Sequence, residues 1–180
     1  KFINEKVIIL NPKMQAILID RGFGESEKDT LILDSFETLY LLYNNKLELK
    51  KVNKAIVFDE LIQNYIQKND DTLTRFLLYR DLRTKGYVVK DGFGFGSDFR
   101  VYERGSYGLK DAKFLIFAFN EGTQEKIGSL YKNIEQITKM GKEPIIAVIE
   151  RRGEIIYYKI NKINFLENKP ELEMKDFDFN

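Results

Sequence analysis

The order of helical and extended segments in the second half of the chain leaves it few possible folds. Apolar residues recur at helical spacing over 73–85, and Gly86 follows as a residue suited to end that helix. Shorter apolar runs predict the remaining elements: strands at 87–90, 99–103 and 113–119, a helix over 124–140, and a hairpin of strands at 144–150 and 154–160. The second half is therefore predicted to be a mixed α/β (α+β) unit.

The first half contains helix and strand signals of the same kind. Its predicted elements are a strand at 7–10, a helix from Pro12 capped by Asn11, a helix capped by Asp34 or Ser35, a strand at 47–52 and a helix at 59–67. The polar run at 69–72 separates the two halves. We therefore expect an N-terminal domain at 1–70, a second domain at 71–163 and an acidic tail at 164–180.

Composition excludes several classes of function. The formal charge of +1 provides no strong positive field of the kind that free-standing nucleic-acid binders use. The chain contains no cysteine and no histidine, so it lacks thiolate chemistry and the usual proton shuttle near neutral pH. No apolar run is long enough to cross a bilayer, and we expect a cytoplasmic protein.

Residues 87–113, YVVKDGFGFGSDFRVYERGSYGLKDAK, resemble the catalytic-domain block of archaeal tRNA-splicing endonucleases. That family has a strand close to GYVVK, a turn rich in Gly and Phe, and then DFRVYERG. Residues 35–40, SFETLY, resemble a helix of its N-terminal domain. The resemblance implies a small α/β N-terminal domain followed by a restriction-endonuclease-like α/β domain with a mixed central sheet.

The resemblance also implies a chemistry that needs neither metal nor cofactor. In the family, a tyrosine helps to deprotonate the 2′-hydroxyl of RNA, a histidine protonates the leaving oxygen, and a lysine offsets charge on the phosphate. The matching positions are Tyr102, Asp111 in place of the histidine, and Lys142. Considered without the family, Tyr102 is a packing residue of a strand and Lys142 a solvated charge at a helix end.

Two positions, one of them outside this set, depart from the family pattern. An aspartate is ionised at neutral pH unless its surroundings perturb it, so Asp111 cannot donate the proton that the histidine supplies. Glu135 stands where catalytic members usually carry an arginine. The chain is therefore expected to be the structural subunit of a heterotetramer, whose partners are a catalytic paralogue and precursor tRNA containing a bulge-helix-bulge.

Two contact surfaces follow from the resemblance. The strand at 154–160 is expected to pair with the same strand of the catalytic partner through apolar side chains, named here as Ile155, Ile156, Tyr157 and Ile160. A loop acid is expected to dock into a basic pocket on the opposite dimer. Glu121 is the first candidate and Glu125 the second, and ordinary solvated charges remain the alternative.

Other functions stay open at this point. Asp98, Asp111 and Lys113 imitate the Asp…Asp-x-Lys arrangement of metal-dependent nucleases, in which two carboxylates hold Mg²⁺. A self-sufficient metal-free nuclease would have to use Tyr102 and Lys142 alone. A binding module with no role in RNA processing is a third possibility.

Overall fold

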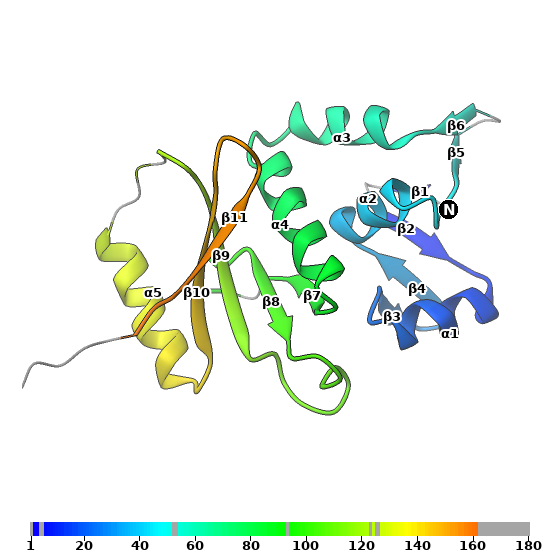
Figure 1. Cartoon of the computed structure of the whole chain (residues 1–180). Helices are drawn as coiled ribbons and strands as arrows, with labels where there is room; N and C mark the ends of the chain where they lie inside the picture. The colour runs from blue at the N-terminus through cyan, green and yellow to red at the C-terminus, as the bar shows by residue number, and fades with distance from the viewer. Residues whose placement is uncertain are drawn as a thin grey trace, which may run out of the picture.

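A computed structural model describes residues 2–3, 6–51, 54–92, 94–122, 124 and 127–161 (Figure 1). The predicted tail at 164–180, and the last two residues of the predicted second domain, lie outside this part of the chain. Among the described residues, no helix is long and apolar enough to span a bilayer.

The N-terminal half is built on a small antiparallel sheet in the order β1-β2-β4-β3. Its elements are β1 (Phe2–Ile3), β2 (Lys6–Ile9), α1 (Pro12–Asp20), β3 (Glu25–Glu27), β4 (Thr30–Leu33), α2 (Ser35–Tyr43), the hairpin β5 (Leu49–Lys51) with β6 (Lys54–Ile56), and α3 (Phe58–Ile66). The predicted caps are confirmed, because the Asn11 side chain accepts from the backbone at the start of α1 and Asp34 caps α2. Strands β1, β3, β4 and β6 were not predicted; β3 in particular is short, polar and exposed.

The C-terminal half is a five-stranded mixed sheet in the order β11-β10-β9-β8-β7. Its elements are α4 (Thr72–Thr84), β7 (Val88–Asp91), β8 (Phe99–Tyr102), β9 (Phe114–Asn120), α5 (Ile127–Lys139), β10 (Glu143–Ile149) and β11 (Ile155–Lys159). Every pair is antiparallel except β9 with β10, which α5 connects. The mixed α/β class expected from the sequence is confirmed in both halves.

The two helices of the C-terminal half cover opposite faces of its sheet, as side-chain alternation along β9 requires. Ile116 faces α4 and belongs to one buried cluster with Leu78 and Tyr79. Leu115 and Phe117 face α5 and pack around Ile137.

The two halves pack through α2 and α4. Phe76 of α4 belongs to the N-terminal core, whereas Tyr79, one turn later, belongs to the C-terminal core and stacks with Phe36 of α2. Beside this contact, the Lys90 ammonium of β7 lies 2.8 Å from a Glu37 carboxylate oxygen of α2, and both side chains are almost fully buried. The boundary after residue 70 stays a prediction, because α4 contributes to both cores.

Candidate active site

The three positions expected to form the catalytic triad lie at one end of the C-terminal sheet. Tyr102 is the last residue of β8, Asp111 lies in the loop that leads into β9, and Lys142 directly precedes β10. Because β8 runs antiparallel to β9 and β9 runs parallel to β10, the end of β8 and the starts of the other two strands coincide. Strand topology thus groups residues that are far apart in the sequence.

Tyr102 is held by a second tyrosine. The rings of Tyr102 and Tyr107 meet edge to face, with centroids 4.9 Å apart and planes at 88°. The loop carrying Tyr107 is pinned by Ser106, whose hydroxyl donates to the Glu103 carbonyl and whose own carbonyl accepts from two backbone amides. Both rings stay half-exposed beside Asp111.

Lys142 is turned onto the backbone of the neighbouring loop. Gly141, with φ of 72°, ends the chain segment after α5 in a left-handed conformation that favours glycine and directs the next residue toward the sheet. The Lys142 ammonium then donates to the Ala112 carbonyl over 2.7 Å. This bond uses one of the three ammonium donors and holds the side chain against the loop.

A chain of charges borders the same end of the sheet. The Lys113 ammonium donates to Glu103 and lies 3.7 Å from Glu143, which in turn pairs with Lys159 at 2.9 Å. The hydrogen bond that Lys113 donates to Glu103 raises the pKa of Lys113, and the one that Glu143 accepts from Lys159 lowers the pKa of Glu143. These neighbours hold the charged forms of both side chains and use lysine cations that could otherwise contact phosphate.

The carboxylates of the predicted metal site do not come together. One Asp98 oxygen accepts from the Ala118 amide at 2.7 Å, and the other lies 3.0 Å from Arg75 Nε. Ala118 is four residues along β9 from its start at Phe114, or about 13 Å from the end where Asp111 lies. Lys113 is paired with glutamates, and the described residues contain no cluster of three metal-ligating side chains. The alternative metal site formed by Asp98 and Asp111 is therefore not assembled in the described residues; sequence spacing does not reveal the register of β9.

The structure shows which side chains of the expected contact strand face this chain's own core. β11 is an edge strand that pairs with β10, as its predicted role requires. However, Ile155 and Tyr157 face the α4 core, and the Tyr157 hydroxyl donates to Asp81 at 2.6 Å. Ile160, half-buried, bonds through its amide to the Pro144 carbonyl.

The outer apolar face of β11 consists instead of Ile156 and Tyr158, which are 39% and 51% exposed. The prediction treated the apolar run of this strand as one surface and did not name Tyr158. The two-residue alternation of a strand was the available signal.

Glu121 is tied to its own domain. One of its carboxylate oxygens accepts from the Arg151 amide at 3.2 Å in the hairpin turn between β10 and β11, although half of the side chain stays exposed. Glu125 lies outside the described residues. Glu135, at the position of the family arginine, pairs with Lys139 on α5 at 3.4 Å.

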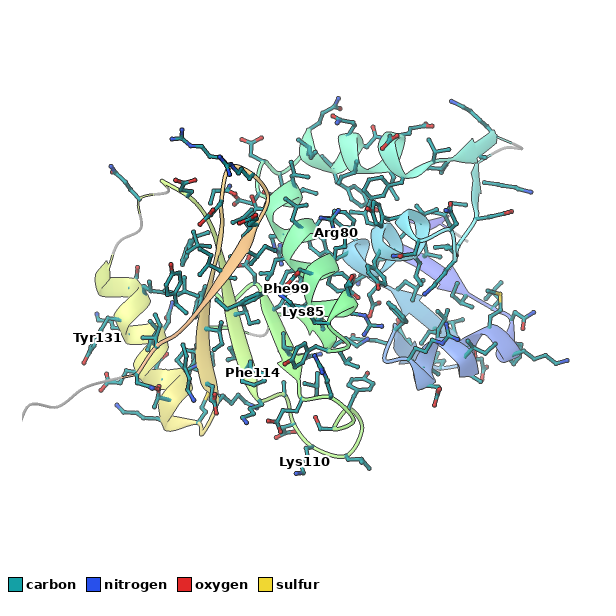
Figure 2. The ribbon with its side chains drawn as sticks, in the orientation of Figure 1. Arg80, Lys85, Phe99, Lys110, Phe114 and Tyr131 are labelled. Atoms are coloured by element: carbon teal, nitrogen blue, oxygen red, sulfur yellow. The ribbon has the colours of Figure 1, made fainter. Side chains whose placement is uncertain are left out.

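The arginines of α4 make contacts with both halves of the chain. Arg75 pairs with Asp91 and lies over the Phe36 ring. The guanidinium carbon of Arg83 lies 3.8 Å from the centroid of the Phe23 ring, and the same guanidinium donates to the Arg21 carbonyl. Arg80, labelled in Figure 2, lies over a tyrosine ring of α2. These cations are therefore used in joining the two halves.

Comparisons with known proteins cover most of the chain. A family model described as the tRNA intron endonuclease, catalytic C-terminal domain, matches residues 72–157, and the model for the N-terminal domain of the same enzyme matches residues 1–62. The chain is 31% identical to the tRNA-splicing endonuclease of Methanococcus maripaludis over 161 residues, which is 89% of this chain and 91% of that protein. It is also 31% identical to the tRNA-splicing endonuclease of Thermococcus onnurineus over 145 residues, covering 81% and 84% of the two chains.

Proposed function

The chain belongs to the tRNA intron endonuclease family, and we propose that it is the structural subunit of a heterotetrameric tRNA-splicing endonuclease. In this role it does not cut RNA itself. It positions a catalytic paralogue on the bulge-helix-bulge of precursor tRNA, and the paralogue performs the metal-independent cleavage.

The observation that carries this proposal is Asp111 at the triad end of the sheet. A general acid contributes about 10²- to 10⁴-fold to the rate of such a reaction. Asp111 stands in its place, and the sequence contains no histidine to substitute for it. A carboxylate beside the scissile phosphate would add repulsion to the loss of the proton donor.

The neighbouring cations support the same proposal. Lys142 already donates to the Ala112 carbonyl, and Lys113 is paired with Glu103. The arginines of α4 that could contact RNA phosphates pack instead on rings of the N-terminal half. We therefore expect this chain to bind RNA weakly through electrostatic contacts and to have few groups for transition-state stabilisation.

The proposal is tested by cleavage of a bulge-helix-bulge RNA in EDTA. We expect no cutting by this chain alone and cutting once its histidine-containing paralogue is added. Tyr102→Phe and Lys142→Ala in this chain should leave the rate of the mixture within about twofold, because the reacting groups belong to the paralogue. A mixture in which the paralogue lacks its histidine is the matched control and should be inactive.

Two results would contradict the proposal. Cleavage by this chain alone in EDTA would mean that Tyr102 and Lys142 suffice for a self-sufficient enzyme. Cleavage by this chain alone that requires Mg²⁺ would point to carboxylates as metal ligands, although Asp98 and Asp111 lie apart in the folded chain.

A further inference from the structure

A shallow, open surface depression lies beside the end of β8 and has a volume of about 610 Å³. We call it the tyrosine pocket; its lining residues are Tyr102, Tyr107, Gly108, Leu109, Lys110 and Asp111. Figure 2 shows Lys110 on the loop at the lower edge of the C-terminal half.

The polar side chains of this pocket are unpaired. Within the described residues, no hydrogen bond or ion pair engages the hydroxyls of Tyr102 and Tyr107, the Lys110 ammonium or the Asp111 carboxylate. The cations just outside it, Lys113 and Lys142, are both engaged. Unused donors and acceptors that converge on one depression are the groups that a ligand would pair with.

The two tyrosines present a fixed aromatic surface. Their edge-to-face contact holds the rings at 88° to each other, and the Lys90 ammonium lies 5.7 Å from the centroid of Tyr107. Lys90 is itself immobilised in the buried pair with Glu37. Half-exposed rings that are held in place are the surface on which unstacked RNA bases bind.

Asp111 determines which part of a nucleotide enters. Its carboxylate would repel a phosphate, so a nucleotide bound here would place its base in the pocket and its phosphate outside. A carboxylate accepts hydrogen bonds and donates none. Guanine alone among the four RNA bases presents two adjacent donors, N1–H and the N2 amino group, on its Watson–Crick edge, and these match the two carboxylate oxygens.

We propose that the tyrosine pocket holds one unpaired base of the RNA, with guanine preferred, through stacking on Tyr107, contact of the base edge with Tyr102 and pairing with Asp111. The choice of RNA as the ligand rests on the proposed function. The position that lost the catalytic acid becomes, on this view, a base-reading position.

The test measures binding of fluorescently labelled heptanucleotides UUUGUUU, UUUAUUU, UUUCUUU and UUUUUUU to the full chain by anisotropy at low salt. We expect the guanine heptamer to bind about tenfold more tightly than the all-uridine one. Asp111→Asn should reduce that ratio to about twofold or less. Tyr107→Leu should weaken binding of all four by about tenfold, whereas Tyr107→Phe, which keeps the ring, should bind like the wild type.

Matched controls are Tyr131→Leu on the exposed face of α5 and Asp59→Asn on α3, neither of which lines the pocket. Equal affinity for the four heptamers would overturn the proposal, as would the absence of any binding. The proposal would also be overturned if Asp111→Asn strengthened binding of all four heptamers equally, since the carboxylate would then act only by repulsion.

This test is independent of the cleavage assay. If the chain binds bases selectively but fails to activate its paralogue, the structural-subunit role is contradicted. Base binding in the tyrosine pocket is still supported. If the chain activates its paralogue but does not bind bases selectively, only the proposed base binding in the tyrosine pocket is contradicted.

Discussion

Asp34 and Glu37 form a reciprocal cap at the start of α2. An Asp34 oxygen accepts from the Glu37 amide at 2.7 Å, and a Glu37 oxygen accepts from the Asp34 amide at 3.1 Å. Asp34 also lines a cavity of about 480 Å³ between the N-terminal sheet and α4, which Arg75 and Asp91 line as well. Burial, and next the nearby Glu37 carboxylate, raise the pKa of Asp34 from 3.8 to about 7.

This raised pKa has a defined effect on stability. Between about pH 4 and pH 7 the folded chain keeps the Asp34 proton and the unfolded chain loses it, so this residue's contribution to stability falls as the pH rises. The shift corresponds to about 4 kcal/mol at full burial, and partial exposure and solvent screening reduce it to about 2 kcal/mol.

We predict that Asp34→Asn removes this pH dependence. Asparagine caps helices as well as aspartate but does not ionise, so the variant should gain stability relative to the wild type as the pH rises from 4 to 7. Urea unfolding at several pH values measures the difference. Asp20→Asn at the exposed end of α1 is the control. Parallel pH profiles for Asp34→Asn and the wild type would contradict the prediction.

At the scale of secondary structure, β11 combines two different faces. Its inner residues, Ile155 and Tyr157, hold it on the α4 core. Its outer residues, Ile156 and Tyr158, are exposed on a strand whose free edge can accept another strand. An interaction surface made by β11 can therefore be disrupted without disturbing the fold.

We predict that the double variant Ile156→Asp, Tyr158→Asp prevents association with the catalytic paralogue. Two charges on the outer face would be buried without partners in a strand-to-strand interface. Stability of the chain alone should change by no more than about 1 kcal/mol, since both positions face solvent. Sedimentation velocity of the mixture measures association. Ile17→Asp, at an exposed position of α1, is the control, and a double variant that still sediments with the paralogue would exclude this surface.

At the scale of the whole molecule, α4 and one buried ion pair join the two halves. Lys90 of β7 donates to Glu37 and, at 2.6 Å, to the Gly24 carbonyl. Nearby, a side-chain carbon on Gly22 would lie 2.6 Å from the side chain of Val88, and the φ of 70° at Gly22 also favours glycine. The contact between the halves is therefore close-packed and specific.

We predict that Lys90→Met destabilises the protein by about 3–5 kcal/mol, because it leaves the buried Glu37 carboxylate without its partner. Adding Glu37→Gln should recover most of the loss, since the second change removes the stranded charge. Urea unfolding of the single and double variants gives the coupling. Lys54→Met is the matched control, because its exposed pair with Glu60 is worth about 1 kcal/mol or less. Equal costs for Lys90→Met and Lys54→Met would contradict a structural role for the buried pair.

The sequence by itself determined the features that depend on residues close together in the chain. The caps at Asn11 and Asp34 and the glycine-rich turn between β7 and β8 follow from local backbone preferences, and were predicted. The periods of apolar residues likewise predicted both helices and all five strands of the C-terminal half. The positions of Tyr102, Asp111 and Lys142 came from the family motif.

Tertiary structure alone decided which of those residues meet. The register of β9 places Asp98 far from Asp111 and so removes the metal site that spacing suggested. Packing turns Ile155 and Tyr157 inward, draws Lys142 onto the Ala112 carbonyl and sets Tyr107 against Tyr102. These contacts join residues that are distant in sequence or depend on strand register, and the burial of the whole chain selects them where local propensity cannot.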